Sequence, residues 1–529
     1  MGQRIRPTEM AGLIHGHASR TRRWLPRRFR SCFHRQCGFT WTSQVYDRLV
    51  FAAYASHKCS VTLLLRDRLR TTTLRSLLLV VTLLGIGATR PAAQAPERSQ
   101  GDLVPDTTVR GPVLPLEFPE IHVGIAEYRE GPTGTTVFFF PEPVMAAIDV
   151  RGGAPGVVNS EALRIPYEAA YTNAICFSGG YSYGLSAATG VADALKERSD
   201  RPGSWEEIAF VPGAIIFDLG GRRLNAVTPD AELGKAALSA ARPGAFPLGA
   251  QGAGRFAMQG WRFGAGSHSG QGGAFRQRGE TKVAVFTVVN ALGTIVDREG
   301  RVVRCGRTAT DDCGTIRERI EASLAELEPE PDVEGGPTKN TTLTLVVTNE
   351  KLSVVGLQRL AIHVHGSMSR AIQPFSTSGD GDTLIAVTTG QVATQGLSET
   401  ELGMLASEVA WNAVLASVPE LPERGPQDPV SWTVEQMDEA VGEYRFSYWA
   451  RIRIERDGDT LLLHGPGVES LYFPAAGSVR LIPVSADELV VDDDGAYRLR
   501  IERVEGQVDG VTLEPGPWAQ LATRVDNAR

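Results

Sequence analysis

Metal-binding cysteine and histidine motifs are absent from this sequence. Only six of its 529 residues are cysteine and nine are histidine, and none of them forms a CxxC or HExxH pattern. Such spacings bring several ligands to one metal ion. The Gly-rich run from Gly249 to Gly273 also lacks the Gly-Lys-Ser/Thr ending of a phosphate-binding loop. The sequence therefore predicts no metal site and no organic cofactor.

Positive charge is scarce in most of the chain. Of its 54 Lys/Arg and 61 Asp/Glu residues, 16 and 3 lie in residues 1–95, which leaves 38 and 58 for residues 96–529, a balance of −20. Nucleic acids and anionic membrane surfaces attract basic proteins. The acidic balance therefore argues against both as partners.

Long hydrophobic runs are absent too, apart from one near the N-terminus. Arginines between Arg66 and Arg75 precede an apolar run over Leu77–Ala88, and small residues around Ala95 follow. These are the parts of a secretory signal, and the apolar run is too short to span a membrane. Pro96 disfavours cleavage after Ala95, so Gly87 is a second cleavage position and an uncut membrane anchor is the alternative. Residues 61–95 are thus predicted to be the signal peptide region of a secreted or periplasmic protein.

Residues 1–60 have the features of neither a signal nor a folded domain. They are rich in Arg, Trp, His and Cys and show no hydrophobic periodicity. We interpret them as a non-native N-terminal extension upstream of the true start. Three of the six cysteines lie in this extension. Of the others, Cys305 and Cys313 flank a short polar loop and can pair in an oxidising compartment.

Residues 96–418 mix short apolar runs of strand length with longer segments of helical period. The expected strands are Thr135–Phe140, Ala174–Phe177, Ala214–Phe217, Lys282–Val289, Thr342–Thr348 and Thr383–Thr388. The expected helices are Leu185–Arg198, Ala231–Ala241, Ile316–Leu327, Ser353–Ile372 and Ser398–Val418. Ser353 is the expected cap of the fourth helix. The pattern predicts one domain of the α+β class.

The C-terminal segment differs from the preceding domain in its pattern. The Pro-rich segment 419–429 reads as a linker. Residues Arg451–Glu455 alternate, Asp457-Gly458 is a turn signal and Leu461–Leu463 is the return strand. Further short strands are expected at Val479–Pro483, Glu488–Val491, Tyr497–Arg503 and Gly510–Leu513. Residues 430–529 are therefore predicted to be a small all-β domain, similar to the barrel-like domain often found C-terminal to secreted serine hydrolases.

The tripeptide Asn340-Thr341-Thr342 separates an acidic Pro/Gly-rich stretch, Glu326–Lys339, from an apolar run that starts at Leu343. A flexible loop that ends in Asn-Thr at a buried strand is what a self-cleaving hydrolase requires. The Thr341 hydroxyl attacks the Asn340 carbonyl, the peptide bond becomes an ester, and hydrolysis leaves Thr341 as a new N-terminus. Its freed amine can then serve as the base for its own hydroxyl.

Four other motifs accompany this tripeptide. They are Asp149–Gly156 (DVRGGAPG), Ser178–Leu185 (SGGYSYGL), Ala214–Leu219 (AIIFDL) and Gly379–Thr383 (GDGDT). Together the five resemble the self-processing aminopeptidase/amidohydrolase family of L-aminopeptidase/D-esterases, β-aminopeptidases and nylon-oligomer hydrolases, over residues 115–418. The resemblance implies a four-layer αββα sandwich with an N-terminal-nucleophile-type site that hydrolyses amide bonds of small peptides or amino-acid amides. It also implies cleavage into two chains that stay together, and further assembly of these heterodimers into a homo-oligomer.

The resemblance assigns roles to individual residues. Thr341, after the scissile bond to Asn340, maps onto the nucleophile. Asp380 and Asp382 map onto an acidic pair, which can hold the Thr341 ammonium and hydroxyl and tune the pKa of the amine. Asn290 falls where the family places an oxyanion donor, which in comparable sites contributes about 2.7–4 kcal/mol. Asp-Gly pairs also form ordinary turns, which is the alternative interpretation of residues 380–382.

Two departures from the family concern the substrate. Gln259 stands where relatives often carry a lysine, and it can form hydrogen bonds but carries no charge. The aminopeptidase branch has Glu-Thr-Tyr-Asp where this chain has Ile215-Ile216-Phe217-Asp218, so Ile215 cannot anchor a substrate amine. Gln259 and Phe217 are therefore further candidate site residues, and the chain looks closer to the nylon-oligomer hydrolase branch.

Three other functions compete with this hypothesis. Gly180–Gly184 fits the G-x-S-x-G pattern of α/β-hydrolase serine esterases, with Ser182 as nucleophile and Asp218 and His363 or His365 as partners. The two histidines lie within a helical pattern rather than on a late loop, which disfavours this alternative. A non-catalytic binding protein on the same scaffold would suit the departures described above. An acyl transferase that uses the same threonine is the third alternative.

Overall fold

The computed structural model of this chain describes most of the sequence after residue 102. The described residues are 103–164, 169–204, 207–219, 224–264, 266–306, 312–325, 340–393, 397–422, 428–468, 470–492, 497–514 and 516–525. All of them belong to one compact unit, residues 94–529. The predicted N-terminal extension, the signal region and the loop at 326–339 lie outside the described residues.

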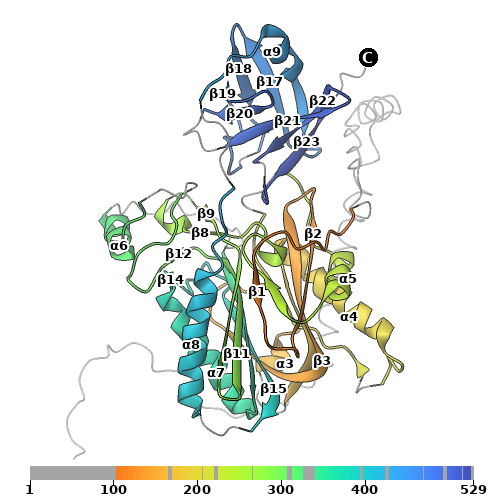
Figure 1. The fold of residues 1–529 in the computed structure, drawn as a ribbon, viewed down its shortest axis with the longest axis vertical. Coiled ribbons are helices and arrows are strands. Elements are labelled where there is room, and N and C mark those ends of the chain that lie inside the picture. Colours follow the sequence, from red (N-terminus) through yellow and green to blue (C-terminus); the bar gives the residue numbers. More distant parts are fainter. Residues whose placement is uncertain are drawn as a thin grey trace, which may run out of the picture. The chain divides into compact units, whose positions relative to one another are not determined.

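A nine-stranded sheet is the frame of the αβ part of this unit (Figure 1). Its strands follow the order β10-β11-β13-β15-β3-β5-β6-β4, and β2 also pairs with β3. They are β2 (His122–Tyr128), β3 (Thr133–Val150), β4 (Val157–Val158), β5 (Ala170–Ser178), β6 (Gly213–Ile215), β10 (Gln271–Arg278), β11 (Thr281–Asn290), β13 (Thr341–Glu350) and β15 (Thr383–Val392). The pairs β13–β15 and β5–β6 are parallel and the other pairs are antiparallel. Every strand predicted in residues 96–418 is part of this sheet.

Strand β3 divides the sheet into two arms that face each other. Its pairing with β5 shifts register between Phe139 and Val144. The ring of Phe138 on β3 lies 5.1 Å from the ring of Phe286 on β11 and 5.5 Å from the ring of Phe177 on β5. Strands β11 and β3 are separated in the sheet by β13 and β15, so the first contact crosses from one arm to the other. The aromatic side chains therefore fill a core between two sheet layers.

Helices cover the outer face of each arm. On one side α4 (Ser186–Arg198) and α5 (Ala231–Ala240) pack with Ala174 and Cys176 of β5. On the other side α7 (Val354–Ser367) and α8 (Glu399–Leu415) pack with Val346 and Ala386 of the central strands. Strand residues next to these, such as Leu345, lie in the inner core, because side chains alternate between the two faces of a strand. The predicted four-layer αββα sandwich is confirmed.

Shorter elements connect these layers. They are β1 (Val113–Pro115), α3 (Glu161–Arg164), η2 (Tyr181–Leu185), β7 (Ala245–Pro247), η4 (Gly252–Gly254), β8 (Met258–Gln259), η5 (Trp261–Phe263), β9 (Ser267–His268), β12 (Thr294–Ile295), α6 (Ile316–Ala325), η6 (Met368–Arg370) and β14 (Ile372–Gln373). Helix α7 begins after Ser353, whose side chain accepts the Gly356 N–H as predicted. It ends earlier than predicted because Ile372–Gln373 pairs with β12. Pro374 also disfavours a helical conformation at the residue before it, Gln373.

The C-terminal strands form a closed antiparallel barrel. The strands are β16 (Gly442–Arg445), β17 (Arg451–Asp457), β18 (Thr460–His464), β19 (Ser478–Pro483), β20 (Glu488–Val491), β21 (Arg498–Val504), β22 (Gln507–Leu513) and β23 (Gln520–Val525), each paired with the next and β23 with β16. The predicted barrel-like domain is confirmed, with two strands, β16 and β23, that the sequence did not predict. Helix α9 (Val434–Ala440) was also missed, although Thr433 and Gln436 form a capping box that is visible in the sequence.

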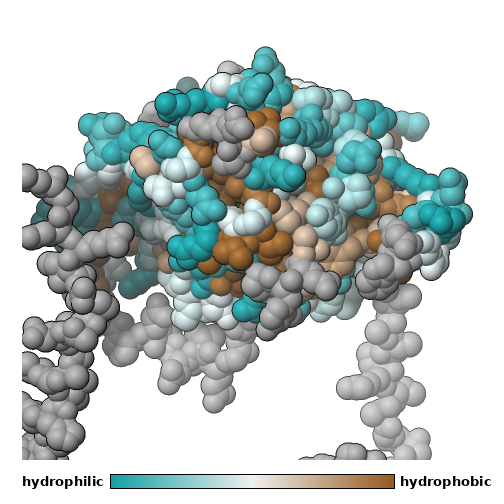
Figure 2. All heavy atoms as spheres, turned by 90° about the horizontal axis from the view of Figure 1, so that it is seen from below, coloured by the Kyte–Doolittle hydropathy of each residue, from teal (hydrophilic) through white to brown (hydrophobic). Residues whose placement is uncertain are grey.

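Apolar residues also reach the surface of this unit. Figure 2 shows one face on which hydrophobic residues gather in the middle and hydrophilic residues surround them. Among the described residues, Val355 of α7 and Met404 of α8 are exposed hydrophobic side chains on the outer helices. Within the described ranges, no helix is both long and apolar enough to cross a membrane.

Candidate active site

Asn340 and Thr341 lie at the start of β13, in the middle of the sheet. Both residues are buried. The Thr341 Oγ1 hydroxyl donates a hydrogen bond to the carbonyl oxygen of Asn340 over 2.5 Å. The same carbonyl oxygen accepts the Gly381 N–H over 2.8 Å. The hydroxyl predicted to attack this peptide therefore lies against it, and a backbone N–H polarises the carbonyl from another direction.

Asp380 and Asp382 come to Thr341 through the pairing of β13 with β15. Because the two strands are parallel, their N-terminal ends lie at the same edge of the sheet, with Leu343 opposite Thr383. The residue between the two aspartates, Gly381, faces the Thr341 hydroxyl. A Cβ at Gly381 would lie 2.6 Å from Thr341 Oγ1, so only glycine fits this close approach.

Backbone and side-chain donors hold both carboxylates in place. Asp382 Oδ1 accepts the Thr342 N–H over 2.6 Å, and its Oδ2 accepts the Ser376 N–H over 2.9 Å. Asp380 Oδ2 accepts from the Thr377 N–H and hydroxyl over 2.9 and 2.7 Å. The acidic pair is thus rigidly positioned beside the Asn340–Thr341 peptide.

Burial changes the acidity of one member of the pair. Desolvation, and secondly the charge of Asp380, raise the pKa of Asp382 to about 7, although two backbone N–H donors oppose the shift. A carboxyl group that titrates near neutral pH can both accept and return a proton. Asp382 has therefore the acidity that a proton-transfer group needs beside Thr341.

Backbone hydrogen bonds join the DVRGGAPG motif to the loop that carries Asp380 and Asp382. The N–H groups of Arg151 and Gly152 donate to the Asp382 carbonyl oxygen over 3.1 and 3.3 Å, and the Ala154 N–H donates to that of Asp380 over 2.9 Å. A Cβ at Gly152 would lie 2.2 Å from the Asp380 carbonyl oxygen. Gly152 is therefore required for the close packing of two backbone segments, a role that the sequence alone did not indicate.

Asn290 lies directly opposite Thr341 in the ladder between β11 and β13. Its Oδ1 accepts the Met258 N–H over 3.0 Å, and its Nδ2 donates to the Phe217 carbonyl oxygen over 3.3 Å. The structure therefore brings Asn290 together with Thr341, and Phe217 with Asn290 through the Phe217 main chain.

Gln259 is also buried, but its amide is occupied by other groups. Its Nε2 donates to Ser267 Oγ and, over 2.8 Å, to the Arg304 carbonyl oxygen, while its Oε1 accepts the Ile295 N–H over 2.9 Å. None of these partners belongs to the surroundings of Thr341 described above. Gln259 therefore ties together three connecting segments of the backbone.

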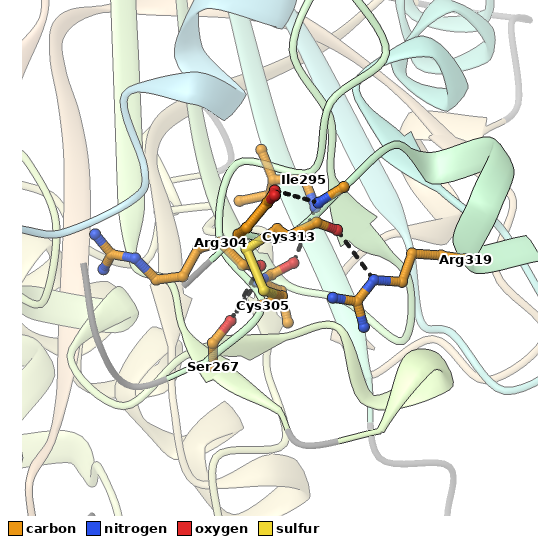
Figure 3. Close-up of a disulfide and its surroundings, with 9 residues drawn as sticks. Ser267, Ile295, Arg304, Cys305, Cys313 and Arg319 are labelled. Carbon is orange, nitrogen blue, oxygen red and sulfur yellow. Dashed lines mark hydrogen bonds between the residues drawn. A yellow bond between two sulfur atoms is a disulfide. The ribbon is translucent and has the colours of Figure 1, made fainter. Parts of the chain in front are cut away.

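The predicted cysteine pair lies beside this network. Cys305 and Cys313 form a disulfide with a Cα–Cα distance of 5.5 Å. Figure 3 shows that the disulfide lies between the side chains of Arg304 and Arg319. The Arg319 Nε–H donates to the Cys313 carbonyl oxygen over 3.1 Å. The disulfide thus begins at the residue after Arg304, whose carbonyl oxygen accepts the Gln259 amide.

The alternative serine triad is not assembled in the structure. Ser182 is exposed on η2. The Asp218 carboxylate instead accepts the Gly180 N–H over 2.8 Å and the Thr133 hydroxyl over 2.6 Å. His365 lies on α7, where its Nδ1 contacts Asp149 Oδ2 at 3.0 Å. Helix α7 covers one outer face of the sandwich, whereas the Ser182 segment leads into α4 on the opposite outer face, which separates the nucleophile from its proposed base.

Comparison with known proteins adds an independent line of evidence. Residues 117–441 match the model of Peptidase family S58. The chain is 41% identical over 341 residues to a 6-aminohexanoate-oligomer endohydrolase of Paenarthrobacter ureafaciens, an alignment that covers 61% of this chain and 91% of that protein. It is 34% identical over 305 residues to an uncharacterized aminopeptidase of Mycobacterium bovis, with 54% and 85% covered. Among solved structures, a Burkholderia sp. beta-aminopeptidase matches with a TM-score of 0.43 and 17% identity over 58% of this chain and 89% of that one.

The family match includes every residue of the site described above, and it ends just before the first barrel strand, β16. It spans more than half of the chain, and the relatives are matched over most of their own length. On this evidence the chain belongs to peptidase family S58 and is a hydrolase of amide bonds.

Proposed function

We propose that the chain cleaves itself between Asn340 and Thr341 and then uses Thr341 as an N-terminal nucleophile. The observation that carries this proposal is the 2.5 Å contact between the Thr341 hydroxyl and the Asn340 carbonyl oxygen, beside a buried acidic pair. This contact keeps the hydroxyl next to the carbonyl group whose carbon it must attack for the acyl group to shift from nitrogen to oxygen.

Self-cleavage takes place in two steps. Thr341 Oγ1 loses its proton and bonds to the Asn340 carbonyl carbon, the bond from this carbon to the Thr341 nitrogen breaks, and the nitrogen takes up a proton. Asp382 is suited to relay this proton because its pKa lies near neutrality. The Gly381 N–H, 2.8 Å from the carbonyl oxygen, stabilises the negative charge that develops on it. Water then hydrolyses the ester and frees the Asn340 carboxylate and the Thr341 hydroxyl.

Turnover repeats the same chemistry on a substrate amide. The free Thr341 amine takes a proton from its hydroxyl, which attacks the substrate carbonyl; the resulting ammonium group then gives the proton to the departing nitrogen, and the product leaves as an amine. The Asn290 amide faces Thr341 across the ladder and serves as the donor to the oxyanion. Asp380 and Asp382 hold the new Thr341 ammonium group by charge. Water finally releases the acyl group from Thr341.

Amide-linked oligomers without a free α-amine near the scissile bond are the proposed substrate class. One matched relative is named for hydrolysis of 6-aminohexanoate oligomers. In this chain Ile215 is buried against Gly156, so no carboxylate is available there to bind a substrate amine. We expect a 6-aminohexanoate oligomer to be cleaved faster than an amino-acid p-nitroanilide.

Export and assembly complete the proposal. The N-terminal signal-like segment and the Cys305–Cys313 disulfide both suit a secreted or periplasmic protein. Apolar residues gathered on one face (Figure 2), together with the exposed Val355 and Met404, suit further association of the processed heterodimers. Sedimentation equilibrium of the processed protein tests this association.

Intact-mass spectrometry with N-terminal sequencing tests the central step. Protein expressed from residue 96 is expected to yield two chains, the second with the 529 − 340 = 189 residues from Thr341 onward. Thr341→Ala is expected to remain a single chain. Thr344→Ala, in the same strand, is the matched control, because the Thr344 hydroxyl contacts Thr287 Oγ1 and Met368 Sδ rather than the acidic pair, and it is expected to be cleaved like the wild type. An uncut wild-type chain, or cleavage of Thr341→Ala at the same bond, would contradict the mechanism.

An acyl transferase would be recognised by a different result. Its consumption of an acyl donor would depend on an added amine, whereas the hydrolase needs only water. Self-cleavage without turnover of any small amide would instead favour a binding protein on the same scaffold.

A further inference from the structure

We propose that Trp518 of the C-terminal barrel is a positioning residue for the Asn290 amide, so that the barrel completes the active site. This inference rests on the role of Asn290 proposed above. The barrel strands lie beyond the segment matched by the family, which ends at residue 441. The coupling would therefore be a property of this chain's own architecture rather than of the matched domain.

Two consecutive residues between β22 and β23, Pro517 and Trp518, contact Arg255 and His268. These two residues lie on either side of Met258, whose N–H binds Asn290. The carbonyl oxygen of Pro517 accepts the Arg255 Nε–H over 3.0 Å. The Trp518 ring stacks on the His268 ring, with centroids 3.8 Å apart and planes inclined by 8°. Trp518 is buried, so this stacking excludes water and holds His268 in place.

His268 transmits the contact to Met258. In the two-stranded sheet β8–β9, His268 is the direct partner of Met258. The His268 ring also packs edge-on against Phe256, with centroids 5.1 Å apart. Phe256 and Met258 belong to the same hydrophobic cluster as Trp518 and the barrel interior. Met258 is thus connected to the barrel both through its strand partner His268 and through the shared hydrophobic cluster.

Met258 in turn orients Asn290. Its N–H donates to Asn290 Oδ1 over 3.0 Å, which directs the Nδ2 group towards the Phe217 carbonyl oxygen. A flipped amide would place its NH2 group against the Met258 N–H, two donors facing each other. The position of the Met258 N–H therefore decides which end of the amide a substrate oxyanion meets.

The segment that carries Met258 needs such support. Gly252 and Gly260 within it have positive φ angles of 54° and 86°, and glycines lose more backbone freedom on ordering than other residues. At its start, Arg255 forms a buried ion pair with Glu127, whose Oε1 accepts the Gly252 N–H over 2.7 Å. Arg255 anchors the segment to the sandwich and, through Pro517, to the barrel, and Trp518 anchors its end.

Acylation of the processed enzyme by p-nitrophenyl acetate is the test reaction, with nitrophenolate release as the readout and Thr341→Ala as the blank. Asn290→Ala is expected to lower the acylation rate constant by roughly 100- to 1000-fold. Trp518→Ala is expected to lower it by about tenfold to a hundredfold, since it misplaces the same donor. Trp518→Phe keeps an aromatic face for His268 and is expected to remain close to the wild type.

A double-mutant cycle separates positioning from general destabilisation. If Trp518 acts through Asn290, Trp518→Ala has no further effect in the Asn290→Ala background. Trp432→Ala is the matched control, because this buried tryptophan, which precedes α9, donates its indole N–H to the carbonyl oxygen of Ser485 between β19 and β20. It is expected to lower the melting temperature but not the acylation rate constant. Self-cleavage of Trp518→Ala is expected to be complete, because the scissile carbonyl is held by Gly381 and not by Asn290.

Each contrary result has a distinct meaning. Acylation of Trp518→Ala within twofold of the wild type, additive losses in the double mutant, or an equal loss in Trp432→Ala would overturn the positioning role. His268→Ala removes the same stack from the sandwich side, and it decides the question should Trp518→Ala fail to fold. Wild-type enzyme that is not acylated, or Asn290→Ala with an unchanged rate constant, would instead overturn the proposed function itself.

Discussion

Asp382 is a carboxyl group held almost entirely away from water, one residue after the glycine that contacts Thr341. Its folded-state pKa of about 7 lies above the ordinary value of 3.8. Between these two values the unfolded chain has lost the proton while the folded chain retains it. Folding therefore takes up a proton in this window, and the free energy of unfolding falls as pH rises from about 4 to about 7.

This linkage is testable in the uncleaved Thr341→Ala protein. We expect its urea midpoint to decrease between pH 4.5 and 7 more steeply than that of the Thr341→Ala/Asp382→Asn protein, because asparagine does not titrate. The difference between the two curves removes the groups that do not interact with Asp382 and leaves Asp382 together with its effect on the neighbouring Asp380. Parallel curves would show that Asp382 is already ionised at pH 4.5 in the folded protein.

Individual residues also show which parts of the site could be predicted from the sequence and which could not. Thr341, Asn290, Asp380 and Asp382 lie together as expected, because they sit at the ends of strands whose apolar pattern is plain. Gln259 was only a candidate from its place in a motif. Its partners, Ser267, Ile295 and Arg304, are spread along the chain, so no local sequence pattern predicts the hydrogen bonds of Gln259.

At the scale of elements, the end of β3 and the loop before β15 form one closely packed unit. A Cβ at Gly152 would lie 2.2 Å from the Asp380 carbonyl oxygen and 2.3 Å from the Asp382 nitrogen, both of which are backbone atoms that cannot rotate away. Gly152→Ala must therefore displace the acidic loop from Thr341.

We expect Gly152→Ala to abolish or strongly slow self-cleavage and to destabilise the fold by about 1–3 kcal/mol, as overpacked substitutions do. Gly203→Ala is the matched control, because a Cβ there has no neighbour within 4 Å. The cleaved fraction after expression, measured by intact mass, compares the two. Complete cleavage of Gly152→Ala would mean that the acidic loop tolerates displacement.

At the scale of the whole molecule, the two predicted products are interleaved. Strand β13, after the scissile bond, pairs with β11 from before it, and β15 pairs with β3 in the same manner. The inner core contains Phe286 from the first product and Leu345 from the second. The disulfide joins Cys305 to Cys313, both before the scissile bond, so it does not link the products.

We therefore expect the two products to co-elute in size-exclusion chromatography and to separate on a non-reducing denaturing gel. Hydrogen-bonded ladders and the shared core hold them together until the fold is lost. Elution of either product alone under native conditions would contradict this expectation.

Elements with strong local patterns could be predicted from the sequence alone: the sandwich strands and helices, the hairpin of β17 and β18, and the motifs that indicated the family. Those signals depend on residues close together in the chain, namely apolar period, caps and turns. Four features became visible only in the folded chain: the early end of α7, the barrel closure by β16 and β23, the packing role of Gly152 and the chain of contacts from Trp518 to Asn290. Each of these depends on atoms brought together from distant parts of the chain, where the contact itself is the information.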